Sequence, residues 1–227
     1  PQFVSAAEKL VLRKGGGAIA LLTTTQAVYA YYNREINTQY LTDQFAGIIG
    51  DTRNTFGEAC REGKNTTYIR SHDGGEIANF RKFSLLGDPA LTPDFPQYNV
   101  MLDSITDGYT LQRADTVKAL GAYTINGSVR DSSGNILPGF NGLLYITLFD
   151  KPRTITTISG CNQTFKVQDN TVYKGRVTVT NGLFSVSFIT PKDINYYFGT
   201  GKVSTYAQND ITDAAGVDTT VKVGGFS

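Results

Sequence analysis

A proline-containing stretch at residues 92–96, TPDFP, divides this sequence into two parts of different character. Each proline fixes its own φ angle and disfavours a helical conformation in the residue before it, so the stretch is predicted to be an extended connector. Helical and strand patterns alternate before it, whereas short segments of period-2 hydrophobicity follow one another after it. We therefore predict an α/β domain over residues 1–97 and an all-β domain over residues 98–227.

The first domain opens with a capping-box motif. Ser5 and Glu8 are spaced so that the hydroxyl and the carboxylate can each accept a hydrogen bond from an amide at a helix start. A helix over residues 5–14 is predicted, and the three glycines at 15–17 end it. The run at 18–23 is too short for a helix and apolar on both faces, which predicts a central strand in the middle of a parallel sheet.

More helical and strand patterns follow before the connector. The predicted elements are helices at 26–45 and 55–66, a turn at 71–75 and a strand at 83–86. The helix at 55–66 starts at a second capping box, Thr55 with Glu58. The strand ends at Gly87, Asp88 and Pro89, and we expect a structural turn there in which Asp88 accepts backbone amides.

The second domain consists of period-2 segments separated by turn-forming residues. The predicted strands are 123–130, 143–149, 172–180, 183–189 and 202–207, and the predicted turns are 131–135, 181–182 and 213–216. About seven strands without a helix predict a β-sandwich of immunoglobulin-like type.

Charge is nearly balanced, with 21 Lys and Arg against 20 Asp and Glu, and no basic stripe threaded with aromatic residues occurs along the sequence. A nucleic acid or an anionic membrane is therefore not an expected partner. The longest apolar stretch, around 18–22, is too short to span a bilayer. Residues 1–4, PQFV, carry neither an initiator Met nor a signal-peptide pattern, so we expect the sequence to begin inside a longer protein.

The two cysteines, Cys60 and Cys161, lie in segments of different character, so a disulfide framework is not expected and both thiols should be free and mostly buried. Cys60 and His72 are the one pair that could act as a thiolate–imidazole dyad. The structural interpretation is favoured, with Cys60 a small buried residue of a helix and His72 part of a polar turn.

Two further groups of residues have a structural and a functional interpretation. Asn209, Asp210, Asp213 and Asp218 could supply oxygen ligands to calcium, but their spacing fits no calcium loop, and a solvated hairpin tip is expected instead. No metal and no cofactor is predicted. The aromatic segment 196–198, YYF, either forms a contact surface or fills the core of the sandwich.

Two ordered groups of motifs resemble the gingipain-like (C25-type) cysteine peptidases, and within them the PorU-type sortases of the type IX secretion system. The first group is SAAEKL at 5–10, GGAIALLTTT at 16–25, VY at 28–29, Asn33 and FSLLGDPAL at 83–91. The second is FDK at 149–151, YKG at 173–175, VTNGLF at 179–184, FITPKDINY at 188–196, GTG at 199–201 and YA at 206–207.

This resemblance implies the C-terminal half of a caspase-like αβα sandwich, followed by an immunoglobulin-like domain. The catalytic His and Cys of the family end two successive strands that precede residue 1, the Cys by roughly ten residues, so no catalytic residue falls within this sequence. The whole protein would remove C-terminal sorting domains from exported proteins and attach them to lipopolysaccharide through a thioester intermediate. Other outer-membrane secretion components would be its partners, and the bacterial cell surface its location.

The resemblance also places one candidate substrate contact in this sequence. Thr23, Thr24 and Thr25 follow a strand at the edge of the sheet where ligands usually bind, and Tyr29 falls where secreted gingipains place an aromatic wall for a substrate side chain. In the structural interpretation, Thr25 caps the long helix and Tyr29 packs on the sheet. For the whole chain, a partner-binding module without catalysis and a secreted gingipain-type protease are the alternatives.

Overall fold

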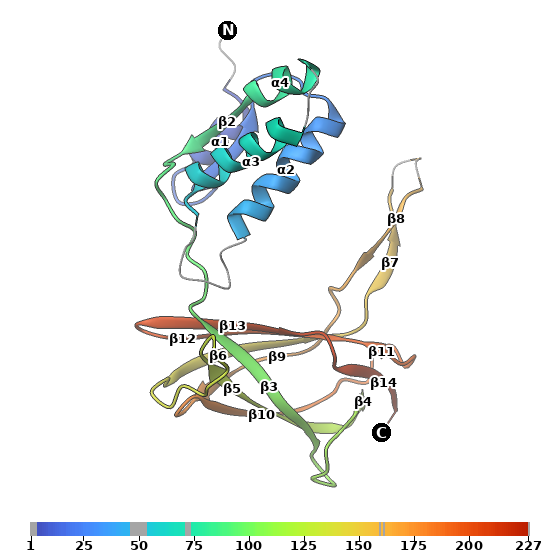
Figure 1. The fold of residues 1–227 in the computed structure, drawn as a ribbon. Helices are drawn as coiled ribbons and strands as arrows, with labels where there is room; N and C mark the ends of the chain where they lie inside the picture. The colour runs from blue at the N-terminus through green and yellow to red at the C-terminus, as the bar shows by residue number, and fades with distance from the viewer. Residues whose placement is uncertain (1–3, 46–53, 71–73, 159, 161, 227) are drawn as a thin grey trace. The chain divides into compact units, whose positions relative to one another are not determined.

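The computed structural model describes residues 4–45, 54–70, 74–158, 160 and 162–226. The chain divides into two compact units, Pro1–Phe95 and Pro96–Ser227. The division lies inside the proline-containing connector, next to the predicted boundary. Unit 1 mixes helices and strands, and unit 2 is made mostly of β-strands, in agreement with the predicted classes (Figure 1).

The elements described in unit 1 are α1 (Ala6–Val11), β1 (Ala20–Thr24), α2 (Ala30–Phe45), α3 (Phe56–Arg70), α4 (Gly74–Arg81) and β2 (Phe83–Gly87). Both predicted capping boxes are present. Glu8 Oε2 accepts from the Ser5 amide at 2.8 Å, and Glu58 Oε2 accepts from the Thr55 amide at 2.9 Å. The predicted end of the first helix is wrong, because α1 ends at Val11 with Leu12 as its C-cap, before the glycines at 15–17. Gly17 instead allows a close approach of the chain to the carbonyl oxygen of Leu10, which a Cβ at this position would meet.

The prediction that residues 18–23 form the middle strand of a parallel sheet is wrong for the residues that the structure describes. There β1 pairs with β2 alone, in an antiparallel two-stranded sheet whose register runs from Ala20↔Gly87 to Thr24↔Phe83. Every residue of β1 is half-buried rather than buried. A run of apolar residues indicates that both faces of a strand are covered. It does not indicate whether the neighbouring strand is parallel or antiparallel.

The helix boundaries also differ from the predictions. α2 begins at Ala30 rather than at residue 26, and α3 continues to Arg70 rather than ending at 66. The turn predicted at 71–75 falls partly on residues 71–73, which lie outside the described residues, and α4 begins at Gly74. Helix α4 was not predicted, because its sequence GGEIANFR starts with two glycines that are typical of a turn.

A small apolar cluster holds unit 1 together. Ile36 of α2, Phe80 of α4 and Phe83 of β2 are buried against one another, with Leu22 and Val28 packed at the edge. Helices α2 and α4 and strand β2 therefore share a core of few residues.

The strands of unit 2 are β3 (Tyr98–Asp107), β4 (Thr116–Ala119), β5 (Ala122–Arg130), β6 (Gly142–Phe149), β7 (Arg153–Thr156), β8 (Thr164–Val167), β9 (Thr171–Val179), β10 (Leu183–Ile189), β11 (Gly199–Thr200), β12 (Lys202–Asn209), β13 (Thr212–Asp218) and β14 (Lys222–Phe226). All five predicted strands are present with ends within two residues of those expected.

The main sheet of unit 2 has the strand order β10-β5-β3-β13-β12-β6-β9. Its two antiparallel parts, β10-β5-β3 and β13-β12-β6-β9, are connected by a parallel pairing of two residues, Ala214↔Tyr98 and Ala215↔Asn99. A three-stranded sheet, β11-β14-β4, and the hairpin β7-β8 complete the unit.

The turn predicted at 213–216 is wrong, because these residues lie in β13. The turn lies at Asn209 instead, whose Oδ1 accepts from the Thr212 amide at 2.8 Å. Strand β3 was not predicted, since the register shift between Leu102 and Ser104 breaks its alternation of apolar and polar residues.

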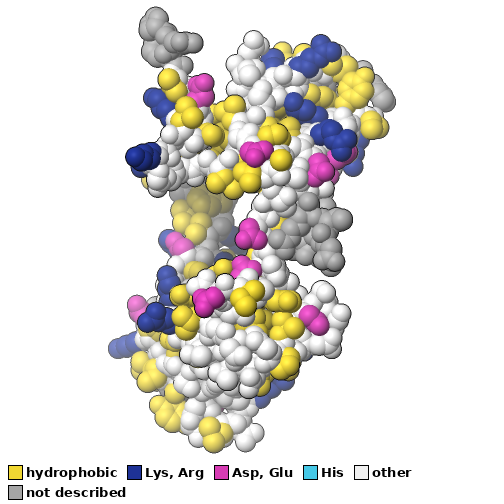
Figure 2. Space-filling model, turned by 90° about the vertical axis from the view of Figure 1, so that its left-hand side faces the viewer, with side chains coloured by type: hydrophobic (Ala, Val, Ile, Leu, Met, Phe, Trp, Pro, Cys, Tyr) yellow, Lys and Arg dark blue, Asp and Glu magenta, His cyan; other side chains and the backbone are white. Residues whose placement is uncertain are grey.

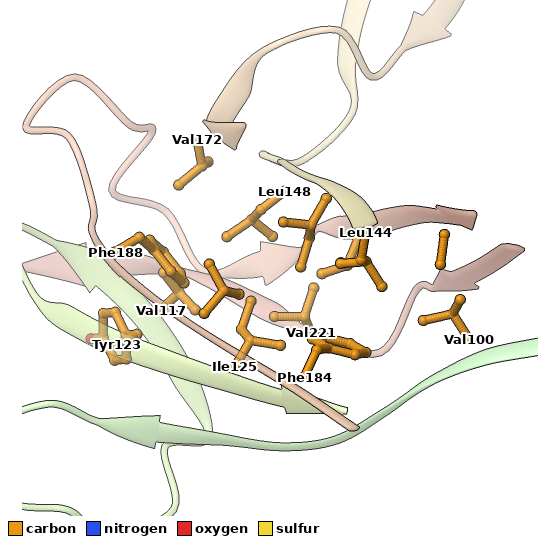
Figure 3. Close-up of a cluster of buried hydrophobic side chains, with 14 of the residues drawn as sticks. Val100, Val117, Tyr123, Ile125, Leu144, Leu148, Val172, Phe184, Phe188 and Val221 are labelled. Carbon is orange, nitrogen blue, oxygen red and sulfur yellow. The ribbon is translucent and has the colours of Figure 1, made fainter. Parts of the chain in front are cut away.

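The core of unit 2 is formed by the inward-facing residues of its alternating strands. Leu144 and Leu148 of β6 lie close to Ile125 of β5 and to Phe184 and Phe188 of β10 in one continuous cluster (Figure 3). Residues that follow each buried position in β10 are exposed, as period-2 alternation requires.

On the face shown in Figure 2, each unit carries charged side chains of both signs and scattered hydrophobic side chains. Within the described ranges, no helix combines the length and the apolar composition that crossing a lipid bilayer requires.

Leu144→Ala and Leu143→Ala test the assignment of the core, because the two leucines are adjacent in β6 and are 0% and 39% exposed. Leu144→Ala is expected to lower the free energy of unfolding by about 3 kcal/mol, through lost burial and the cavity left behind. Leu143→Ala should lower it by less than about 1 kcal/mol. Urea unfolding followed by circular dichroism measures both; equal losses would contradict this orientation of β6.

Candidate functional site

The three threonines of the candidate substrate contact end strand β1. Thr23 and Thr24 lie opposite Ser84 and Phe83 of β2 and are half-buried, whereas Thr25 is exposed. Thr25 donates both its amide, at 2.8 Å, and its hydroxyl, at 3.2 Å, to the carbonyl oxygen of Lys82. Thr25 therefore extends the contact between the two strands. The structural interpretation of the sequence, in which Thr25 caps the long helix, is wrong on this point.

The loop 25–29 leads from β1 to α2 and is held by the segment 79–82. The Lys82 ammonium donates to the carbonyl oxygen of Ala27 at 2.8 Å. The Tyr29 amide donates to Asn79 Oδ1 at 3.0 Å. Together with Thr25, these contacts fix the loop at its beginning, its middle and its end.

Tyr29 presents its ring to solvent. Its side chain is 66% exposed, so the alternative in which it packs on the sheet is wrong. The ring lies edge-on to Tyr32, with centroids 6.2 Å apart, and Tyr32 lies edge-on to Tyr31 at 5.5 Å. The Arg34 guanidinium lies 5.3 Å from the centroid of the Tyr31 ring. Tyr29 and the first residues of α2 thus carry three tyrosine rings in edge-on contact, with one guanidinium beside them.

The turn after β2 has a structural role in the described contacts. Asp88 Oδ1 accepts from the Ala90 amide at 2.9 Å, the turn contact expected of it. The carbonyl oxygen of Pro89 accepts from the Gly57 amide of α3 at 2.9 Å. Gly87 has φ +119°, and a Cβ there would lie 2.8 Å from the carbonyl oxygen of Ile19. These residues connect β2 to the start of α3.

Cys60 has the properties of a structural thiol. It is a free, half-buried cysteine of α3. Burial raises the pKa of its thiol, and the nearby charge of Lys64 opposes that shift without cancelling it. A thiol with a raised pKa forms little of the thiolate that a nucleophile needs. His72 and Cys161 lie outside the described residues.

A buried ion pair lies where β6 ends in unit 2. The Asp150 side chain is 2% exposed, and its Oδ1 accepts from the Lys151 ammonium at 2.6 Å. Its Oδ2 accepts from the Asn195 amide at 3.0 Å. Burial alone would raise the pKa of Asp150, but the hydrogen bonds from Lys151 and Asn195 outweigh it and lower that pKa below its ordinary value. The sequence analysis did not predict this ion pair, because two charged residues that follow one another in sequence are normally exposed to solvent.

The oxygen-rich residues near the β12–β13 turn bind backbone amides. Asp213 Oδ1 accepts from the Gln97 amide at 3.2 Å, and Asp218 Oδ1 accepts from the Thr220 amide at 2.6 Å. In the part of the chain that the structure describes, no group of three or more His, Cys, Asp and Glu side chains is arranged to hold a metal ion.

The aromatic segment 196–198 lies on the surface. Tyr197 is 84% exposed, and Tyr196 and Phe198 are exposed as well, so these rings do not fill the core. Tyr196 lies edge-on to Phe226, with centroids 6.4 Å apart, and its carbonyl oxygen accepts from the Gly225 amide at 2.8 Å. Backbone contacts therefore hold the segment while its rings remain in solvent.

The comparison with protein families decides what unit 1 is. The model of peptidase family C25 matches residues 1–94, which end one residue before unit 1 does. Residues 1–94 belong to peptidase family C25. The family model does not extend into unit 2. Comparison with curated protein sequences gives no significant match.

One solved structure is similar to the chain over both units. The chain is similar to dimeric latent PorU from Porphyromonas gingivalis, with 25% sequence identity and a TM-score of 0.53. That similarity covers 93% of this chain and 20% of PorU, so the chain spans about a fifth of the length of that relative.

Two other solved structures have lower sequence identity with the chain and lower TM-scores. Gingipain R, an Arg-specific cysteine proteinase, is 15% identical, with 96% of this chain and 40% of that chain covered and a TM-score of 0.33. Spo0M, a sporulation control protein from Bacillus subtilis, is 14% identical, with 59% of this chain and 51% of that chain covered and a TM-score of 0.38.

Two residues next to the candidate contact were missed by the sequence analysis. Asn79 and Lys82 reach loop 25–29 from positions 50 and 55 residues after their partners in the chain. Asn79 lies in α4, which the sequence pattern did not predict. No short-range motif connects either residue to the loop.

Asp150→Asn tests the buried ion pair, with Asp169→Asn as a control, since Asp169 pairs with Arg153 on the surface. At pH 7 Asp150→Asn is expected to lower the free energy of unfolding by about 3 kcal/mol, because the Lys151 ammonium, whose side chain is 12% exposed, loses its counter-charge. Asp169→Asn should lower it far less.

The lowered pKa of Asp150 also predicts how the stability difference between the wild-type chain and Asp150→Asn depends on pH. The pKa of Asp150 is lower in the folded chain than its ordinary value of 3.8, so its stabilisation is complete above that pH and is lost as the pH falls below 3.8 and through the folded pKa. The stability difference between the wild-type chain and Asp150→Asn should therefore shrink below about pH 4. Urea unfolding at a series of pH values measures it, and a difference that stays constant would contradict the assignment.

Proposed function

We propose that this chain is a segment of a bacterial cell-surface cysteine endopeptidase of the type IX secretion system, acting as a sortase. The similarity to PorU carries the proposal, because it extends over 93% of the chain and so includes both units. In this proposal the whole protein removes C-terminal sorting domains from exported proteins and attaches them to lipopolysaccharide. Its partners are those exported proteins and other outer-membrane secretion components.

The catalytic Cys and His of the proposed peptidase belong to a part of the whole protein other than these residues. Cys60, with its raised thiol pKa, is a poor nucleophile. Among the described residues β1 pairs with β2 alone, so its other edge is open to a further strand. We propose that strands of the caspase-like αβα sandwich pair there in the whole protein.

Unit 2 would be the immunoglobulin-like domain of the same protein. Support comes from its two antiparallel strand sets, β10-β5-β3 and β13-β12-β6-β9, connected by a short parallel pairing. Antiparallel sets with one shared core are the architecture of such sandwiches.

Thr23, Thr24, Thr25 and Tyr29 would contribute one wall of the substrate cleft. The exposed Tyr29 ring and the exposed Thr25 offer apolar area and hydrogen-bonding groups at the end of a strand, where ligands of α/β proteins usually bind. A polypeptide substrate needs contacts of both kinds.

A second candidate role concerns unit 2 alone. The exposed segment Tyr196, Tyr197 and Phe198 favours a surface that contacts a partner protein, since aromatic residues are enriched at such interfaces. This role would remain even if the whole protein lacked catalysis.

Thiol labelling of the full-length gene product tests the peptidase proposal. An iodoacetamide probe at pH 7 is expected to label a cysteine outside residues 1–227 fastest, because a catalytic thiolate reacts faster than a thiol of raised pKa. Cys60→Ser is the control and should leave the labelling unchanged. Labelling that is confined to Cys60 would overturn the proposal.

Tyr29→Ala and Tyr31→Ala test the substrate contact in the same protein, because both rings are exposed on the first turn of α2 or just before it. Tyr29→Ala is expected to raise KM for a peptide substrate by about tenfold through loss of contact area. Tyr31→Ala should change it little. Equal effects of the two variants, measured by initial rates of cleavage, would remove Tyr29 from the contact.

A further inference from the structure

Helix α2 lacks the start signal that the other capped helices of unit 1 contain in their own sequence. In α1 and α3 a Glu three residues after the first capping residue accepts from the amide of that residue. In α2 the carbonyl oxygen of Tyr29 accepts the first helical hydrogen bond, from the Asn33 amide at 2.9 Å, so Tyr29 is the capping residue. The residue three positions later is Tyr32, and the first turn contains no acidic side chain.

Asn79 of α4 replaces the missing carboxylate. Its Oδ1 accepts from the Tyr29 amide at 3.0 Å, the same backbone position that Glu8 and Glu58 satisfy in the other two helices. Asn79 is 1% exposed, so this bond is shielded from water. A buried amide group at a helix start costs free energy when it is left without an acceptor. The start of α2, and with it Tyr29, is therefore set by a residue of another helix.

Lys82 adds a second connection from the same segment. Its ammonium donates to the Ala27 carbonyl oxygen at 2.8 Å, and its own carbonyl oxygen accepts from the Thr25 amide at 2.8 Å. Charged donors form stronger hydrogen bonds than neutral ones. Lys82 thus bridges the end of β1 and the middle of loop 25–29, while Asn79 holds the end of that loop.

We propose that Asn79 and Lys82 are positioning residues that fix loop 25–29 and thereby place the Tyr29 ring for substrate specificity. The part that concerns specificity rests on the proposed peptidase function. The part that concerns the loop rests on the hydrogen bonds alone. Neither residue touches the substrate in this proposal; each acts through the backbone of the loop.

Amide hydrogen exchange of this 227-residue chain tests the loop without any activity. Asn79→Ala is expected to speed exchange at the Tyr29 amide by about tenfold or more, because the acceptor is lost. Asn79→Asp keeps an acceptor near the positive end of α2 and should preserve slow exchange. Lys82→Met, which keeps the apolar stem, should speed exchange within loop 25–29.

Lys64→Met is the matched control. Lys64 also donates to a backbone carbonyl oxygen of unit 1, that of Phe83 at 2.7 Å, but it does not contact the loop. The Lys64→Met substitution should leave hydrogen exchange at the Tyr29 amide unchanged. Circular dichroism establishes that each variant folds, and Lys82→Met decides the question if the buried Asn79→Ala does not fold. Unchanged exchange at Tyr29 and in the loop, or equal changes in Lys64→Met, would overturn the proposal.

Kinetics of the full-length protein then test specificity. Asn79→Ala and Lys82→Met are expected to raise KM for a peptide by about fivefold, with kcat changed less than about twofold, and Asn79→Asp should restore KM. A loss of stability alone would lower the active fraction and leave KM unchanged. A wild-type protein that cleaves no peptide would contradict the peptidase proposal, whereas normal KM values in both variants would contradict the positioning role.

Discussion

Unit 2 depends on a charge that is buried where β6 ends. A carboxylate removed from water is strongly unfavourable unless it is paired and hydrogen-bonded, and Asp150 meets both conditions through Lys151 and the Asn195 amide. The Lys151 ammonium in turn donates to the carbonyl oxygens of Asn195 and Val223. One ion pair therefore connects the end of β6, the loop before β11 and the strand β14. The exposed aromatic segment 196–198 follows directly from this junction, so its backbone is fixed while its rings stay in solvent.

Unit 1 is organised by contacts between segments that lie far apart in sequence. Its buried apolar cluster is small, with Ile36, Phe80 and Phe83 at its centre, and β1 has one neighbouring strand among the described residues. Segment 79–82 hydrogen-bonds to the residues between the end of β1 and the start of α2. The candidate substrate contact thus consists of the end of β1 and the loop that follows it, and residues in α4 and just after it hydrogen-bond to that loop. The residues concerned lie within the part of the chain that matches peptidase family C25.

Local signals in the sequence predicted local structure well. The capping boxes at Ser5 and Thr55 and the alternation in β5, β6, β9, β10 and β12 depend on residues within a few positions of one another. Strand β3 was missed because a bulge interrupts its alternation, and the direction of β1 was wrong because hydrophobicity does not encode the direction of a partner. The threonines and Tyr29 could be placed near one another from sequence. Asn79 could not, because it caps α2 from fifty residues away.

We propose that β1 and β2 are part of a larger peptidase sheet. Amide hydrogen exchange across Ala20–Thr24, compared between this chain and the full-length gene product, tests this proposal. In this chain the β1 amides that are not bonded to β2 should exchange fast, and in the full-length protein they should be protected by a further strand. Equal exchange of these amides in both proteins would contradict the claim.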